Sequence, residues 1–132
     1  MSRSNHQLVR DFFAGLSRGN LPDDLFTNEM TVWTTVSGGP SDKARYQGGV
    51  KILQSLFQDG LRYSVDSVTA EDDRVAAEVQ GRGRLKNGED YHNTYVFMFR
   101  IRNGRIATVA EHCNPIVVNE KIMPLLQAAM KR

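Results

Sequence analysis

Glu111 is the side chain whose type and position best suit acid–base chemistry. It stands near the end of an apolar segment, residues 106–113, and Ala107 and Val109 precede it at intervals of two. A strand therefore places all three side chains on one face. If that face borders an apolar cavity, the carboxylate is desolvated and its pKa rises towards the range of a general base. The structural alternative is a glutamate that is hydrogen-bonded to a helix end or paired with an arginine.

Tyr95 and Asn93 share one face of the segment 91–102, which alternates between apolar and polar residues. Either side chain could donate a hydrogen bond to a carbonyl oxygen that gains negative charge during a reaction. The alternative for Tyr95 is a core aromatic with a satisfied hydroxyl. The alternative for Asn93 is a bond to the backbone.

The histidines and the single cysteine are weaker candidates for catalysis or metal binding. His112 follows Glu111 directly, so a strand turns it to the opposite face, where we interpret it as a rim or dimer residue. Cys113 shares the parity of Glu111 and could border the same cavity, but nothing indicates an activated thiolate. The three histidines lack the spacing of a ligand pair, so we expect no metal site.

The elements that must position these groups follow from hydrophobic periodicity and turn signals. The pattern predicts helices at residues 4–19, 21–26, 41–60 and around 122–129, and strands at 30–36, 61–70, 74–84, 91–102 and 106–113. Ser4 and Ser41 are the expected helix N-caps. The last four strands form a meander of hairpins, which indicates an α+β fold with a curved antiparallel sheet.

Small residues mark one face of the third predicted strand. Val75, Ala77, Val79, Gly81 and Gly83 occur at every second position, whereas the other face is mostly charged or amide: Arg74, Glu78, Gln80, Arg82 and Arg84. We expect the two glycines to permit sharp curvature and to leave room beneath the sheet.

The bulk composition limits the classes of partner. The 132 residues suit a single domain over 1–132, and the net charge of +2 gives no basic face for nucleic acid. No apolar stretch reaches the length of a membrane span, so we expect no membrane partner. The single cysteine excludes an internal disulfide and suits a reducing, cytoplasmic location.

Four local motifs carry a resemblance to a known family. They are Trp33-Thr34-Thr35, the strand from Tyr91 through Asn93, Tyr95 and Phe97 to Phe99, the turn Asn103-Gly104-Arg105-Ile106, and residues 109–115. The chain resembles the superfamily named after nuclear transport factor 2, and within it the SnoaL-like, ketosteroid-isomerase-related proteins. The resemblance implies a cone-shaped (cystatin-like) fold, in which a curved sheet packs on three helices and encloses a pocket. It also implies a homodimer through the outer sheet face, with which Val96 and Met98 are compatible.

The resemblance also implies a site. Glu111 matches the position of a catalytic aspartate in limonene epoxide hydrolase, and Trp33 matches an aromatic wall position. The hydrolase's other polar partners would fall at Val79 and Gly81, and the oxyanion hole of the steroid isomerases is not reproduced, because the first helix offers Phe12 and Phe13. The expected catalytic residues are Glu111, Tyr95 and Asn93, and the expected ligand-binding residues are Trp33, Thr35, Phe97, Val79 and Val109.

Three functions fit these features. The leading one is cofactor-free proton transfer on a small apolar carbonyl compound, of the isomerase or polyketide-cyclase type, in which Glu111 is the base. The second is a non-catalytic small-molecule-binding protein of the same fold, in which a salt bridge would hold the Glu111 carboxylate. The third is an interaction domain that uses its outer sheet face.

Overall fold

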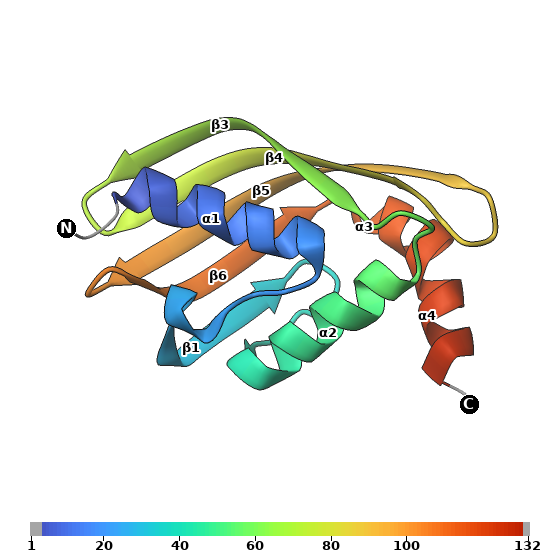
Figure 1. Cartoon of the computed structure of the whole chain (residues 1–132), viewed down its shortest axis with the longest axis horizontal. Coiled ribbons are helices and arrows are strands. Elements are labelled where there is room, and N and C mark those ends of the chain that lie inside the picture. Colours follow the sequence, from blue (N-terminus) through green and yellow to red (C-terminus); the bar gives the residue numbers. More distant parts are fainter. Residues whose placement is uncertain (1–3, 131–132) are drawn as a thin grey trace.

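A computed structural model describes residues 4–130 of the chain (Figure 1). The elements in chain order are α1 (Asn5–Arg18), the 3₁₀ turn η1 (Asp23–Leu25), β1 (Phe26–Thr34), β2 (Ser41–Asp42), α2 (Lys43–Ser55), β3 (Arg62–Glu71), β4 (Arg74–Arg84), β5 (Asp90–Arg102), β6 (Arg105–Cys113), α3 (Pro115–Val117), the π-helical turn η2 (Val118–Ile122) and α4 (Met123–Met130). The predicted α+β class is confirmed, because the helices pack against one face of a single curved sheet.

The sheet has six strands in the order β2-β1-β6-β5-β4-β3. The meander of β3 to β6 is antiparallel, as predicted, and the register of β3 against β4 slips between Val65 and Ser67. The β1–β6 pair is parallel, which the prediction of an antiparallel sheet missed, and it sets Thr34 beside Glu111. Hairpin signals report only neighbouring strands, so they could not reveal this pairing.

Turns and caps show how local sequence sets the element ends. Asn103 and Gly104 have φ values of 53° and 75°, as a two-residue I′ hairpin requires. Ser4 caps α1 as predicted, since its hydroxyl accepts the backbone N–H of Gln7 at 3.1 Å. The predicted Ser41 cap is wrong. Ser41 pairs with β1, and Asp42 caps α2 instead.

The narrow end of the cone is filled by aromatic rings. Phe12 and Phe13 on α1 meet Phe97 and Phe99 on β5 in edge-to-face contacts of 4.9–5.9 Å between ring centroids. Each fully buried ring of this kind contributes roughly 1.5–3 kcal/mol of hydrophobic stabilisation. This end of the sheet is therefore solid core.

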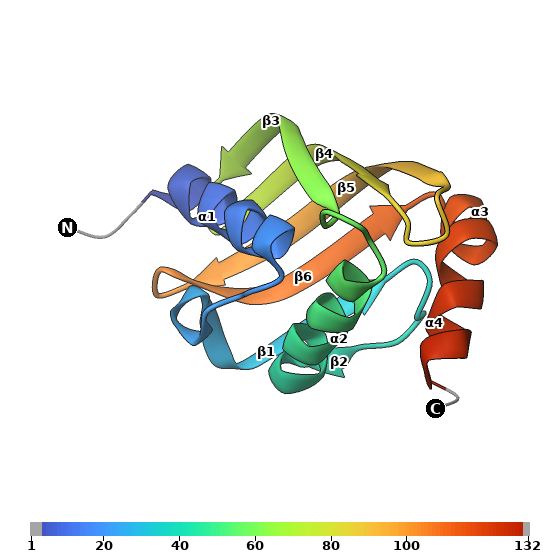
Figure 2. The same ribbon diagram turned by 45° about the vertical axis from the view of Figure 1, so that its right-hand side comes forward.

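The other end of the cone is closed by helices. Both ribbon views place the C-terminal helical segment beside α2 at the end where β6 finishes (Figure 1 and Figure 2). The segment runs from Pro115 to Met130 with a π-helical turn just before Pro124. Pro124 cannot donate to the carbonyl four residues earlier, and a π turn lets the helix continue past it.

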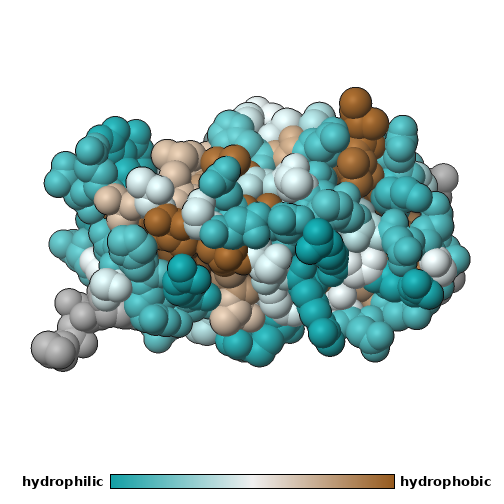
Figure 3. Space-filling model, turned by 90° about the horizontal axis from the view of Figure 1, so that it is seen from above, coloured by the Kyte–Doolittle hydropathy of each residue, from teal (hydrophilic) through white to brown (hydrophobic). Residues whose placement is uncertain are grey.

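The edge strand β3 presents a polar surface. Figure 3 looks down onto this side of the molecule, where hydrophilic residues dominate and apolar ones form small separate groups. Charged side chains on β3, such as Arg62, Asp66 and Glu71, disfavour pairing of this edge with strands of other molecules. Within residues 4–130, no helix combines the length and the apolar character that crossing a membrane requires.

Candidate functional site

A cavity of about 410 Å³ lies between the sheet, α2 and the C-terminal helical segment. Glu111 and Cys113 from β6 and Thr34 from β1 form its floor. Apolar side chains form its other walls: Ile52 and Leu53 from α2, and Val118, Ile122, Met123 and Leu126 from the C-terminal helical segment. The combination of apolar walls and a few polar groups is typical of a small-molecule site.

Glu111 lies in this cavity, and its carboxylate has no partner among residues 4–130. On the sheet it sits between Thr34 of β1 and Phe97 of β5. Within the described part of the chain, no group forms a hydrogen bond or ion pair with the carboxylate. Burial raises the pKa of Glu111 from 4.5 to about 7. The side chain therefore exchanges its proton near neutral pH, as a general base must.

All four tyrosines of the chain line the same cavity: Tyr46 on α2, Tyr63 on β3, and Tyr91 and Tyr95 on β5. Burial is the main cause that raises the pKa of each, and the negative charge of Glu111 adds to it. The four hydroxyls therefore stay protonated at neutral pH. They are neutral hydrogen-bond donors around one carboxylate.

Tyr91 and Tyr95 form a hydroxyl pair with one spare proton. Their oxygens are 2.7 Å apart, and either can be the donor. The pair carries two protons and uses one between its members. No described residue accepts the other, so it is free for a ligand oxygen. Gly81 makes room for this arrangement, since a Cβ there would lie 2.9 Å from the Tyr95 ring.

Tyr46 carries a second unused donor. Its hydroxyl is buried and has no hydrogen-bond partner in the structure. Its ring stacks on Phe12 with centroids 6.4 Å apart, which holds the side chain in place. A buried unsatisfied hydroxyl costs about 1–3 kcal/mol, and an oxygen atom of a bound molecule would remove that cost.

Asn93 is not a cavity residue, which corrects its predicted role as a direct donor. Its amide nitrogen donates to the Tyr91 hydroxyl at 3.2 Å and to the Asn114 carbonyl at 3.1 Å. Its oxygen accepts the backbone N–H groups of Thr94 and Asn114. All its polar atoms are thus committed within the protein. Asn93 positions Tyr91 and the start of the C-terminal helical segment.

The five predicted ligand-binding residues also lie outside the cavity. Phe97, Val79 and Val109 are buried in the core, because α1 covers that part of the inner sheet face. Trp33 lies against His112, with ring centroids 4.9 Å apart. Its neighbours Met30 and Val32 are buried, which turns Trp33 to the outer face. The Thr35 hydroxyl donates to the Glu111 carbonyl at 3.3 Å and accepts the Cys113 N–H at 3.2 Å, so it holds β6 in place.

The expected room beneath the glycines is also filled. The Tyr95 ring occupies the space under Gly81, and the Phe57 ring lies 2.7 Å from where a Gly83 Cβ would stand. The cavity is formed instead at α2, where Gly49 borders it and nothing lies within 4 Å of its Cβ position. Tyr46 is the residue from which the sequence could have indicated a cavity at α2. It lies on the buried face of this helix, and a buried tyrosine hydroxyl needs a hydrogen-bond partner.

His112 and Cys113 follow the predicted parity. His112 is exposed on the outer face. Cys113 borders the cavity, and burial, aided by the charge of Glu111, raises the pKa of its thiol to about 11. The thiol is therefore neutral and a poor nucleophile at physiological pH.

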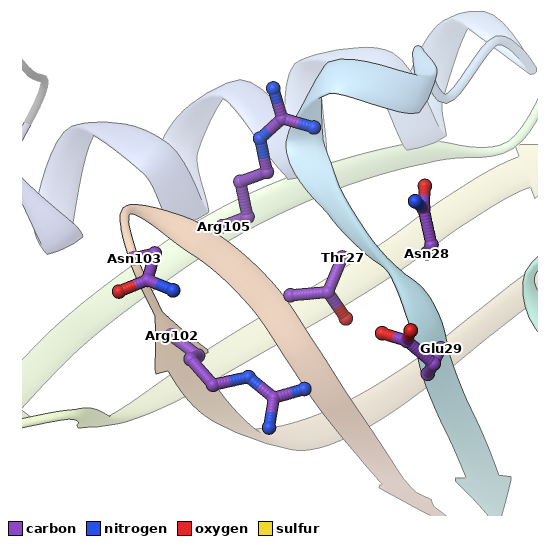
Figure 4. Close-up of a pocket in the computed structure, with 6 residues that line it drawn as sticks. All are labelled: Thr27, Asn28, Glu29, Arg102, Asn103 and Arg105. Carbon is purple, nitrogen blue, oxygen red and sulfur yellow. The ribbon is translucent and has the colours of Figure 1, made fainter.

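A larger hollow of about 740 Å³ lies elsewhere, at the start of β1 and the β5–β6 turn (Figure 4). Its six lining side chains are polar, and those of Arg102 and Arg105 extend to opposite sides of Thr27 rather than towards a common point. Size alone therefore does not make it the site, and the tyrosine-lined cavity is the stronger candidate.

Comparisons with known proteins agree with the fold. A family model described as the SnoaL-like domain matches residues 9–109. No curated protein matches the chain. Wild-type IdmH of Streptomyces antibioticus, a candidate polyketide cyclase, superposes with a TM-score of 0.79 at 18% identity over 89% of this chain and 97% of its own. A candidate SnoaL-like polyketide cyclase from Jannaschia sp. CCS1 gives 0.77 at 16% identity, over 92% and 96%. An NTF2-like protein from Anabaena variabilis gives 0.73 at 24% identity, over 86% and 94%. At these identities the structures show a shared fold.

Proposed function

The chain belongs to the SnoaL-like domain family, and from this premise we propose that it transfers a proton next to the carbonyl group of a small, mainly apolar compound. The observation that carries the proposal is the unpaired Glu111 carboxylate in the tyrosine-lined cavity, with a pKa of about 7. The similarity to candidate polyketide cyclases supports the same class of chemistry.

The proposed reaction begins when Glu111 removes a proton from the carbon beside the carbonyl. The C–H electron pair moves into the carbonyl, whose oxygen becomes an enolate oxygen. The spare proton of the Tyr91–Tyr95 pair hydrogen-bonds to that oxygen as its negative charge grows. If a C=C bond is conjugated with the enolate, the negative charge extends to a more distant carbon; Glu111 returns its proton to that carbon and the carbonyl re-forms, which is an isomerisation. Alternatively, the enolate carbon attacks a second carbonyl of the same molecule, and Glu111 returns its proton to the new alkoxide oxygen, which is an aldol-type cyclisation. The protein's own residues supply each proton transfer, so the step needs no cofactor.

The non-catalytic alternative makes a different structural demand. A binding protein would use Glu111 as a fixed acceptor, held by an arginine or a lysine. No such ion pair forms with Glu111 in the described residues. Keeping an uncompensated carboxylate in an apolar cavity costs stability, and catalysis explains that cost.

Deuterium exchange of 2-tetralone tests the proposal without knowledge of the natural substrate. This bicyclic ketone has acidic protons beside its carbonyl, and NMR in D2O follows their loss. The wild type should accelerate the exchange, and Glu111→Gln should reduce the acceleration at least about 100-fold. Glu29→Gln, an exposed glutamate outside the cavity, is the matched control. Equal rates for the wild type and Glu111→Gln would rule out Glu111 as the base.

We also propose that a second copy of the chain pairs with the outer sheet face. Val96 and Met98 are 41% and 39% exposed there, and the register sets Met98 beside Ala110, which in turn neighbours Trp33. A face with these exposed apolar groups suits a symmetric dimer contact. Met98→Lys should shift the sedimentation coefficient from that of a dimer to that of a monomer. A wild type that sediments as a monomer at micromolar concentration would contradict the proposal.

A further inference from the structure

We propose that Arg45 binds an anionic group of the ligand at the mouth of the tyrosine-lined cavity. The compound would then have an apolar body, a reacting carbonyl near Glu111, and a carboxylate or similar anion at its outer end. This inference rests on the proposed function for the location of the site, and it adds the chemical class of the ligand.

The first support is the placement of charge in the cavity. Arg45 and Glu111 are the two charged residues among the described residues that line it. Arg45 is exposed, and so are its lining neighbours Gly49 and Ile52, which marks where the cavity opens. Among the described residues no ion pair joins the Arg45 guanidinium to the Glu111 carboxylate, and burial raises the pKa of Glu111.

The second support is that Arg45 has no structural partner. Its guanidinium forms no ion pair or hydrogen bond with any residue between 4 and 130. Lys43, two residues earlier in the first turn of α2, does form an ion pair: its ammonium nitrogen lies 3.9 Å from the Asp23 carboxylate. The five N–H donors of Arg45 are thus available for an anion, and their planar fork fits a carboxylate.

The third support is that Arg45 opposes its own helix. It is the third residue of α2, and its backbone N–H donates to the Asp42 carboxylate at 2.8 Å. A helix favours an acidic residue here, because the positive end of its dipole lies at the N-terminus. The first turn of α2 contains no acidic residue, yet carries Lys43 and Arg45. A basic residue at a helix N-terminus that forms no stabilising contact is of the kind expected at a functional site.

The fourth support is the unsatisfied Tyr46 hydroxyl, on the residue next to Arg45. This buried donor lines the same cavity and has no partner among the residues that the structure describes. Together with Arg45 it gives the α2 wall of the cavity donors without acceptors. Since no protein group between residues 4 and 130 accepts a hydrogen bond from either side chain, an oxygen atom of a ligand could serve as the acceptor for both.

Two dyes with the same aromatic body test this inference. 8-Anilinonaphthalene-1-sulfonate carries an anion, and N-phenyl-1-naphthylamine does not; both fluoresce more strongly in apolar cavities. Arg45→Gln should weaken binding of the sulfonate about 10-fold at low salt and change binding of the neutral amine less than twofold. Arg45→Lys should recover most of the loss. Added salt should weaken sulfonate binding to the wild type more than to Arg45→Gln.

Controls separate this result from other causes. Arg10→Gln removes an exposed arginine of α1 outside the cavity and should change neither dye. Arg45→Gln should remain folded, because it removes an unfavourable charge from the helix start. Gly49→Phe should displace both dyes, which shows that they occupy the cavity. Equal sulfonate affinity in Arg45→Gln and the wild type, or no sulfonate binding to the wild type, overturns the inference. Neither outcome touches the exchange experiment on Glu111, so the two proposals can fail separately.

Discussion

Replacing Glu111 by glutamine should stabilise the protein by an amount that grows as the pH rises from about 4.5 and levels off above about 7. Burial raises the pKa of Glu111 from 4.5 to about 7 in the folded state, whereas the unfolded chain keeps the ordinary value. Each pKa unit corresponds to about 1.4 kcal/mol, so the folded wild type carries a cost of up to about 3 kcal/mol once the carboxylate is ionised.

The sign follows from the protons that each state binds. Between about pH 4.5 and pH 7 the folded state holds the Glu111 proton and the unfolded state has lost it. Stability from this group is therefore complete below pH 4.5 and is lost as the pH rises through 7. Glutamine cannot ionise and does not show this loss.

Urea denaturation of both proteins at a series of pH values from 4 to 8.5 measures the effect. The difference in unfolding free energy, Glu111→Gln minus wild type, should increase by about 3 kcal/mol between pH 4 and pH 8. In thermal melts the same difference corresponds to a relative rise in Tm of about 10 °C. Glu29→Gln, which replaces an exposed glutamate outside the cavity, should show no such trend. Parallel stability curves for Glu111→Gln and the wild type would refute the claim that Glu111 is desolvated and unpaired.

Three further variants test the rest of the site. Replacing Tyr91 and Tyr95 together by phenylalanine keeps both rings, including the Tyr95 contacts with Tyr63 and Phe97, but removes both hydroxyls and the spare proton. Exchange of 2-tetralone should then slow about 100-fold; an unchanged rate would exclude the pair as donor. Gly49→Phe should fill the cavity and abolish binding of N-phenyl-1-naphthylamine, whereas Gly48→Phe on the same helix, outside the cavity lining, should bind normally; identical behaviour of the two variants would move the ligand site elsewhere. Asn93→Leu breaks the contacts with Tyr91, Thr94 and Asn114 and should lower the unfolding free energy by about 3 kcal/mol; unchanged stability with lost exchange would restore Asn93 as a direct donor.

Local patterns predicted the strands of the meander and the direction of Glu111. Alternation along a strand places every second side chain on one face, and tight turns such as Asn103-Gly104 leave a clear signal. Those rules depend on neighbouring residues only. They sufficed to set Glu111 and Cys113 inward and His112 outward.

The lining of the cavity could not be read in the same way. An inward side chain meets either a helix or a cavity, and that depends on where distant helices pack. Phe12 and Phe13 cover Phe97, whereas Gly49 leaves space beside Glu111. For Trp33 the run of β-branched residues from Thr31 to Val36 shows no clean alternation, and the resemblance suggested a wall position that the structure does not reproduce.

The pH dependence of 2-tetralone deuterium exchange tests the central claim most directly. If Glu111 is the base, the rate of the wild type should rise with pH through an inflection near 7 and then level off, and Glu111→Gln should lack this inflection. An inflection near 4.5, or the same profile in Glu111→Gln, would contradict the account.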